Sequence, residues 1–256
     1  MKVVILAGGL GTRLIEKTNI KPKPMVEVGG MPILWHIMKT YSHFGFNDFV
    51  ICLGYKGNII KDFFKTYFST TKNVKIINKD ESTKIITNGV EKWKINLVET
   101  GENTMTGGRI SRIRKYVDNK SFFLTYGDGV SDVNIDELLK FHKSNKKLCT
   151  LTAVKPEPRF GTLMLDNNFV TNFKEKNIND VDWINGGYFV CEPSIFNYLK
   201  NDDKEVWEQN PLKELSMSKN LTAYRHDGFW KPMDTLKDSI ELDKMWTLNK
   251  AKWKLW

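Results

Sequence analysis

The sequence predicts a mixed α/β fold, in which helices flank a mainly parallel sheet. A short apolar run at 2–6 ends at two glycines, as a buried strand entering a loop does. Apolar residues then recur at helical spacing up to Gly45, and a second strand-like run follows at 48–54. This β-α-β order favours parallel pairing of the strands.

The next elements follow from start and stop signals. Pro32 suits the first position of a helix that Gly45 ends, and Asn58 is expected to cap a helix reaching about Phe68. Residues 74–100 interrupt the alternation of strands and helices, because β-forming residues cluster around Asn88 and Gly89. We therefore expect a hairpin-rich excursion from the sheet there.

The remaining chain continues the alternation of helices and strands. We expect Thr106 to cap a helix from Gly107 to Val117, a strand ending at Asp128, a helix from the Asn134 cap to Asn145, strands near Cys149–Val154, Gly161–Leu165 and Gly187–Cys191, and a helix from Thr235 to Leu248. No repeat or flexible linker interrupts this order. We predict one domain over residues 1–256.

Composition limits the classes of function. Of the 256 residues, 41% are apolar, which is ample for a continuous core. No segment resembles a signal peptide or a membrane span, so we expect a cytoplasmic protein. Cys52, Cys149 and Cys191 lie in separate apolar runs and are expected to be reduced core residues, with no zinc-site spacing.

The formal charge of +9 admits either a nucleic-acid partner or an anionic small substrate. Most lysines are scattered singly along helical stretches, where a solvated face explains them. There is no dense basic arm and no aromatic-basic RNA motif. We expect no nucleic-acid or membrane partner, although retention on DNA or RNA at moderate salt would revive that class.

The segment LAGGLGTR, at 6–13, is the strongest local signal. A glycine turn after a strand lets backbone N–H groups approach phosphate oxygens, and Arg13 adds a fixed charge. Leu14 stands where the dinucleotide fingerprint has its third glycine, and no Gly-Lys-Ser/Thr of a P-loop is present. We predict a phosphate-binding loop. A nicotinamide-dependent oxidoreductase remains an alternative that tight NADH binding without pyrophosphate release would support.

Charged residues downstream complete a candidate site. Pro22 and Pro24 hold the backbone extended around Lys23, whose ammonium could neutralise an α-phosphate. Asp128 lies between two glycines at the carboxyl end of a strand, and Asp234 precedes a helix. Mg²⁺ commonly takes one or two carboxylates together with substrate phosphates, so these aspartates could share an ion. A turn aspartate and an N-cap are the alternatives.

Two further polar segments could line the site. One combines a helix start with arginine and could hold a base or a phosphate; the other could contact hydroxyls and a phosphate. These are Thr104, Thr106 and Gly107 to Arg109 in the first, and Glu175, Lys176, Asn185, Gly186 and Gly187 in the second. The four histidines, His36, His43, His142 and His226, show no nucleophile motif nearby and are interpreted as structural.

Nearly the whole chain resembles the sugar-nucleotide pyrophosphorylases, and most closely their cytidylyltransferase branch acting on glucose 1-phosphate. The resemblance rests on LAGGLGTRL, KPKPMVEVGGMPILWHIMK, MTGGR, TYGDGVSD, WINGG, FWKPMDTLKD and KAKWKLW. The first segment is shared across the wider superfamily, whereas PILWHIMK, MTGGR and FW-x-PMDTL are more particular to the branch. One departure is Asn177, where proline is common, which bears on the sugar loop and hence on sugar identity.

The resemblance implies a Rossmann-like nucleotidyltransferase fold and roles for individual residues. Arg13, Lys23 and Asp128 would be catalytic. CTP would contact Leu6, Ala7, Gly8, Gly9, Leu10, Gly11, Thr12, Arg13, Lys23, Thr104, Arg109, Gly127 and Asp128; glucose 1-phosphate would face Glu175, Lys176, Asn185, Gly186 and Gly187; and Mg²⁺ would lie on Asp128 and Asp234. The resemblance also implies a homo-oligomer, a hexamer in the nearest relatives. Its product, CDP-glucose, would feed dideoxysugar synthesis for surface polysaccharides such as the O-antigen of lipopolysaccharide.

Base selection depends on a few loop hydrogen bonds that the sequence alone does not place. A uridylyl- or thymidylyltransferase acting on glucose or another hexose 1-phosphate therefore remains open.

Overall fold

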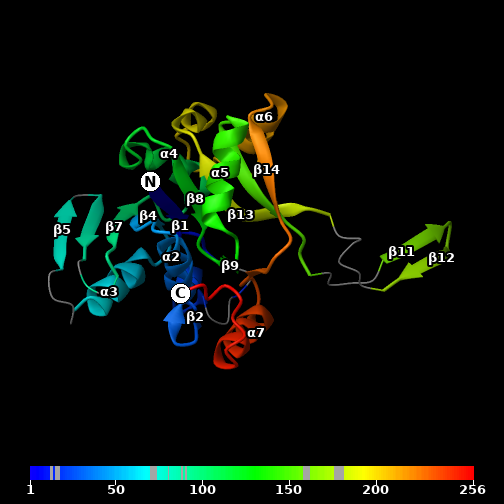
Figure 1. Ribbon diagram of the computed structural model, residues 1–256, viewed down its shortest axis with the longest axis horizontal. Helices are drawn as coiled ribbons and strands as arrows, with labels where there is room; N and C mark the ends of the chain where they lie inside the picture. The colour runs from blue at the N-terminus through cyan, green and yellow to red at the C-terminus, as the bar shows by residue number, and fades with distance from the viewer. Residues whose placement is uncertain are drawn as a thin grey trace.

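The computed structural model (Figure 1) describes residues 1–11, 14, 18–69, 74–79, 81–87, 89, 91–157, 162–175 and 182–256. Within these residues the main feature is a nine-stranded sheet of order β14-β10-β13-β8-β1-β4-β7-β6-β5. Its strands are β1 (Lys2–Leu6), β4 (Asp48–Leu53), β5 (Lys75–Lys79), β6 (Ser82–Ile86), β7 (Lys94–Glu99), β8 (Phe122–Tyr126), β10 (Cys149–Val154), β13 (Ile184–Cys191) and β14 (Leu221–His226).

The sheet is mixed but has one dominant direction. β1 pairs in parallel with β4 on one side and β8 on the other, and β4 pairs in parallel with β7. Only β13 and β6, among the nine described strands, run against the others. The predicted fold class is confirmed.

Helices cover both faces of the sheet because successive side chains of a strand point to opposite sides. Val3 and Ile5 of β1 belong to one core, and Val4 and Leu6 belong to the other. The first core is covered by α2 (Ile33–His43), α3 (Gly57–Tyr67), α5 (Ile135–Asn145) and α7 (Leu236–Thr247); the second is covered by α4 (Thr106–Arg112), η3 (Arg114–Tyr116), η5 (Pro193–Tyr198) and α6 (Asn210–Met217). No described helix is long and apolar enough to cross a bilayer.

The prediction of hairpins at 74–100 is confirmed, but the prediction that this segment leaves the sheet is wrong. β5 and β6 form an antiparallel hairpin, but β6 pairs with β7 and so extends the edge of the main sheet. The segment that does leave the sheet is the hairpin of β11 (Thr162–Asp166) and β12 (Phe169–Lys174), which stands apart from the body in Figure 1. Phe169 and Phe173 on this hairpin are exposed.

Two predicted helix caps are wrong, and one is confirmed. Asn58 lies inside α3, which follows a left-handed Lys56, and Thr106 is the first residue of α4 rather than its cap. The helix begins two residues earlier than the polar side chain suggested at Asn58 and one residue earlier at Thr106. Asn134 does cap α5, since its side chain accepts a hydrogen bond from the Glu137 amide.

The C-terminal tail closes the first core through an aromatic cluster. Trp253 is fully buried, and its indole nitrogen donates to His36, whose other ring nitrogen lies 2.8 Å from the Val28 carbonyl. Trp246 and Trp256 also contact the His36 ring. These tryptophans therefore pack within the subunit. The predicted reduced cysteines are confirmed, since Cys52, Cys149 and Cys191 are free and buried.

Candidate active site

The site lies where the central parallel strands end. β1 and β8 pair in register up to Leu6 and Tyr126, so the chain that follows each strand leaves the sheet at the same edge. After β1 comes the glycine segment at 8–11, and after β8 come Gly127 and Asp128. Open α/β sheets bind ligands at this edge.

Three predicted residues meet there although they are far apart in the sequence. The Lys23 ammonium lies 2.6 Å from an Asp128 carboxylate oxygen and 2.5 Å from an Asp234 carboxylate oxygen. The Lys23 side chain is 8% exposed, whereas 32% of the Asp128 side chain is exposed toward the cavity. One cation and two carboxylates therefore share a half-buried point at the end of the sheet.

Hydrogen bonds hold the backbone of each aspartate in place independently of Lys23. β9 (Gly129–Ser131) pairs with β15 (Trp230–Pro232), and the Met233 amide donates to the Asp128 carbonyl at 2.8 Å. Thr235 then caps α7 in a capping box with Asp238, which also accepts from the Asp234 amide. Thr235, and not Asp234, is thus the N-cap, and the Asp234 carboxylate is left for the site.

Lys23 is positioned by a short turn. η2 (Lys23–Met25) begins at an extended Pro22, and the amides of Met25 and Val26 bond back to the carbonyls of Pro22 and Lys23. The neighbouring lysine, Lys21, instead pairs with Glu27 at 2.6 Å. The two neighbouring lysines therefore have different surroundings, and only Lys23 contacts the aspartates.

A cavity of about 610 Å³ opens beside Lys23 and Asp128, within the size range of small-molecule sites. It is lined by Leu6, Gly8, Gly9, Leu10, Gly11, Lys23, Pro24, Glu102, Asn103, Thr104, Met105, Thr106, Arg109, Tyr126, Gly127, Asp128 and Glu208. A Cβ on Gly9 would meet no atom within 4 Å, so the space in front of this residue is open. Ala7, by contrast, continues the sheet, because its backbone N–H donates a hydrogen bond to the Cys52 carbonyl.

Arg109 braces the glycine loop. Its guanidinium donates to the carbonyls of Gly8 and Leu53 at 2.9 Å each and to the Thr100 hydroxyl. The residue is 3% exposed, and burial lowers the pKa of the guanidinium. A Cβ on Gly8 or Gly54 would lie 2.3 Å from this group, so glycine is required at both positions. Arg109 lines the cavity, but its guanidinium N–H groups donate to backbone carbonyls.

The other wall of the cavity is tied to a distant loop. Thr104 donates to an Asp203 carboxylate oxygen at 2.6 Å, and Arg112 donates to the same oxygen at 2.7 Å. These two hydrogen bonds lower the pKa of Asp203. The amides of Gly107 and Gly108 donate to the Glu205 carbonyl, so the start of α4 is already occupied by protein groups.

A second cavity, of about 210 Å³, lies on the other side of Asp128 and Asp234. Asn185, Gly186 and Gly187 line it, as predicted, together with Thr125, Tyr126, Asp128, Gly129, Tyr188, Trp230, Pro232 and Asp234. Gly187 adopts φ +79°, and a Cβ there would lie 2.5 Å from the Tyr126 ring. The strand therefore approaches the site closely only because this residue is glycine.

Tyr126 separates the two cavities and was not predicted as a site residue. Its hydroxyl donates to Glu208 at 2.5 Å and accepts from the Asn185 amide at 3.0 Å. Burial and the Glu208 carboxylate raise the pKa of Tyr126, which keeps the hydroxyl protonated. Its place before Gly127 was a usable signal. Glu208 and Trp230, which lie far along the chain, had none.

Several predicted residues are not brought into the site. Thr12, Arg13 and Lys176 lie outside the described residues. Glu175 is exposed at the end of β12 and is not among the described residues lining either cavity.

The two aspartates fit a magnesium ion whose other ligands come from substrate phosphates. Among the described residues there is no group of three or more His, Cys, Asp or Glu side chains that could hold a metal. Asp128 and Asp234, however, already converge on one cation, the Lys23 ammonium. Mg²⁺ is commonly held by one or two carboxylates with substrate phosphates completing its shell. The pair fits that arrangement, with a bound triphosphate supplying the remaining oxygens.

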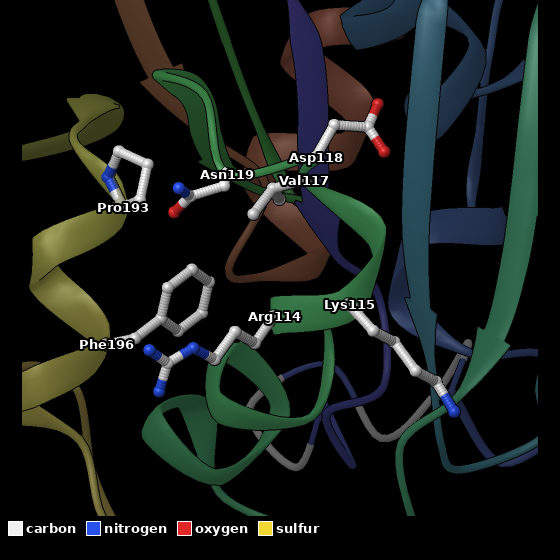
Figure 2. Close-up of a pocket in the computed structure, with 7 residues that line it drawn as sticks. All are labelled: Arg114, Lys115, Val117, Asp118, Asn119, Pro193 and Phe196. Atoms are coloured by element: carbon white, nitrogen blue, oxygen red, sulfur yellow. The ribbon is translucent and has the colours of Figure 1, made fainter.

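A third hollow, of about 350 Å³, lies at the opposite, amino-terminal edge of the strands. Figure 2 shows Arg114 reaching toward Phe196 there, while Lys115 points away. The guanidinium carbon is 5.7 Å from the Phe196 ring centroid. None of the residues of the candidate site lines this hollow, so the two cavities that meet at Asp128 are the ones that matter for chemistry.

Comparisons with known proteins agree with this geometry. The Nucleotidyl transferase family model matches residues 2–235. The chain is 49% identical, over 100% of both chains, to the glucose-1-phosphate cytidylyltransferase of Salmonella typhi.

Solved structures show the same fold at low identity. A UDP-glucose pyrophosphorylase complexed with UDP-glucose has a TM-score of 0.68 at 16% identity, covering 97% of this chain and 98% of that one. HddC from Yersinia pseudotuberculosis, complexed with GMP-PN, has a TM-score of 0.67 at 23% identity, covering 96% and 99%. From the family match and the full-length identity, the chain belongs to the nucleotidyltransferase family, in the branch of the glucose-1-phosphate cytidylyltransferases.

Proposed function

We propose that this enzyme transfers the cytidylyl group of CTP to α-D-glucose 1-phosphate, giving CDP-glucose and pyrophosphate. The observation that carries the proposal is the meeting of Lys23, Asp128 and Asp234 between two cavities. The larger cavity suits a nucleotide and the smaller one a sugar phosphate. Two phosphate-bearing substrates placed on either side of Asp128 would bring their phosphates together at the charged residues.

Several features support nucleotide binding in the larger cavity. The segment 8–11 presents glycines, and the open space in front of Gly9 would admit a phosphate where any side chain would intrude. Arg109 fixes the Gly8 carbonyl, so the loop is held in place before a ligand arrives. We propose direct contacts for Gly9 and Gly11, and a positioning role for Arg109 and Thr104.

The smaller cavity offers polar groups for a sugar. The Asn185 amide and the Gly187 backbone face it beside Tyr126. Trp230 donates to the Gly186 carbonyl at 2.8 Å and so fixes the strand on that side. We propose that Asn185 and Gly187 contact glucose 1-phosphate, and keep Glu175 and Lys176 as predicted contacts of the same substrate.

The chemistry is a single in-line displacement. An oxygen of the sugar phosphate forms a bond to the α-phosphorus of CTP, and the bond from that phosphorus to the bridging oxygen of the leaving pyrophosphate breaks. The attacking oxygen is already ionised near neutral pH, so no general base is needed, and positioning and charge neutralisation account for the catalysis. Lys23, together with the predicted Arg13, would neutralise negative charge gathering on the phosphates.

We propose Mg²⁺ as the cofactor, held by Asp128 and Asp234. When bound, the ion would supply positive charge that neutralises the phosphates. The protein side of the arrangement is the fixed backbone that aims both carboxylates at one point. A homo-oligomeric assembly, a hexamer by family resemblance, a cytoplasmic location and a place in surface-polysaccharide synthesis stay predictions.

The decisive experiment is a pyrophosphate-release assay with CTP, UTP, dTTP and GTP against several sugar 1-phosphates, with and without Mg²⁺. We expect turnover with CTP and glucose 1-phosphate that is lost when the metal is chelated. Strong activity only with UTP or dTTP would support the alternative, a uridylyl- or thymidylyltransferase. Absence of pyrophosphate release with every pair would refute the reaction class.

A further inference from the structure

The shared point between Asp128 and Asp234 is occupied by a side chain of the protein itself. The Lys23 ammonium sits 2.6 Å and 2.5 Å from one oxygen of each carboxylate, and the Lys23 side chain is 8% exposed. Two carboxylates directed at one half-buried point repel each other unless a cation lies between them. Lys23 is that cation in the ligand-free protein.

The same point cannot hold a metal ion and the ammonium together. Mg²⁺ binds carboxylate oxygens at about 2.0–2.1 Å, within the space that the Lys23 nitrogen occupies. The two cations would also repel each other strongly at such a separation. A divalent ion can therefore enter only when the ammonium has moved away.

The larger cavity gives the Lys23 ammonium space into which it can move. Lys23 also lines the larger cavity, next to the glycine segment at 8–11 that would receive a triphosphate. The backbone of both aspartates, in contrast, is held in place, because the Met233 amide donates to the Asp128 carbonyl and the Asp234 amide donates to Asp238 of the capping box that begins α7. The exchange needs only a side-chain movement.

We infer, on the basis of the function proposed above, that Lys23 is a built-in counter-ion that holds the Asp128–Asp234 pair and is exchanged for the divalent cation when a triphosphate enters. In the absence of nucleotide, the lysine excludes the metal. On nucleotide binding, the ammonium turns to the phosphates and the carboxylates accept the ion. The metal thus binds with the nucleotide and not before it.

The test is direct titration with Mn²⁺, an ion that electron paramagnetic resonance detects, in the absence of any nucleotide. Wild-type protein is expected to bind Mn²⁺ weakly. Lys23→Met keeps the length of the side chain without its charge, and we expect it to bind Mn²⁺ at least about 10-fold more tightly because a unit positive charge leaves the coordination point. Lys21→Met is the matched control, since that lysine pairs with Glu27, and it should bind as wild type does.

Two further measurements keep the inference open to refutation. The double variant Lys23→Met/Asp234→Asn should lose the tight Mn²⁺ binding. If Lys23→Met is unstable without metal, Mn²⁺ should raise its thermal midpoint by several degrees while leaving wild type unmoved; Lys23→Gln, which retains hydrogen-bond donors, offers a second variant with the same expectation. Equal Mn²⁺ affinity, or an equal thermal response, in wild type and both variants would overturn the counter-ion role.

The outcome is separable from that of the proposed function. Mn²⁺ titration needs no turnover, whereas the nucleotide and sugar assay needs no variant. Full cytidylyltransferase activity of the wild-type protein, together with unchanged Mn²⁺ binding by Lys23→Met, would refute the exchange alone. Tight Mn²⁺ binding only in the variant, with no pyrophosphate release by wild type, would refute the reaction alone.

Discussion

Acidification should destabilise the protein through His36. The imidazole is fully buried, and its two nitrogens have fixed roles: the Trp253 indole can only donate, so His36 Nδ1 accepts, and Nε2 carries the hydrogen that faces the Val28 carbonyl. The neutral ring is therefore the one that fits. Burial, opposed by hydrogen bonds to backbone carbonyls, lowers the pKa of His36 from 6.5 to about 4.

The size of the effect follows from the two pKa values. The unfolded chain binds a proton on this residue below pH 6.5, while the folded chain does so only near pH 4, so stability falls as pH drops through that window. At about 1.4 kcal/mol per pKa unit, the whole shift corresponds to about 3 kcal/mol. Between pH 7.5 and pH 5 the loss should be about 2 kcal/mol.

The assay is urea unfolding followed by tryptophan fluorescence at pH 7.5 and pH 5. Other groups titrate as well, so the quantity to compare is the pH difference in unfolding free energy between wild type and His36→Gln. Glutamine does not titrate, and its amide can still donate to the Val28 carbonyl. His43→Gln, at an exposed histidine of the same helix, should keep the wild-type difference. Equal pH dependence in wild type and His36→Gln would refute a buried, neutral His36.

Four other substitutions have definite expectations. Asp128→Asn should lower kcat by about 10²- to 10³-fold in the pyrophosphate-release assay; near-normal turnover would remove this carboxylate from the mechanism. Gly8→Ala places a Cβ 2.3 Å from the Arg109 guanidinium and should destabilise the protein by about 1–3 kcal/mol in chemical denaturation. Gly9→Ala is its matched control. It should change stability by less than about 0.5 kcal/mol yet weaken nucleotide binding measured by calorimetry. A larger loss of stability in Gly9→Ala than in Gly8→Ala would contradict the geometry of the loop. Thr235→Ala removes the cap of α7 and should cost about 1 kcal/mol of unfolding free energy, with a fall in activity because Asp234 adjoins that cap; unchanged stability would show that the capping box is not maintained in solution.

The parts of the fold set by local patterns were predictable. The apolar run of β1, the helical spacing in α2 and the Asn134 cap each depend on residues close in sequence. The two caps that failed lie inside their helices: Asn58 is two residues after Lys56, the cap of α3, and Thr106 is one residue after Met105, the cap of α4. Sequence spacing does not decide where a helix begins, since tertiary partners do.

In the candidate site, too, local patterns predict single residues, whereas contacts between distant residues depend on the fold. Asp128 could be predicted from its place after a strand, but its contact with Lys23 joins positions 105 residues apart, and Asp234 is 211 residues from the same lysine. Arg109 beside glycines looked like an anion ligand. In the fold its donors meet the carbonyls of Gly8 and Leu53 instead, which no local pattern reveals.

The central position of β1 also has a kinetic consequence. Val3 pairs with Phe49 on one side and with Phe123 on the other, so a strand synthesised early can complete the sheet only after distant segments have been made. At roughly 5–20 residues per second, β8 leaves the ribosome roughly 6–24 s after β1. During that interval an apolar strand, destined for burial on both faces, can pair with β4 along one edge but has no neighbour along the other. Refolding from denaturant should therefore be slow and prone to aggregation, and nascent chains of this protein should depend on chaperones until β8 emerges.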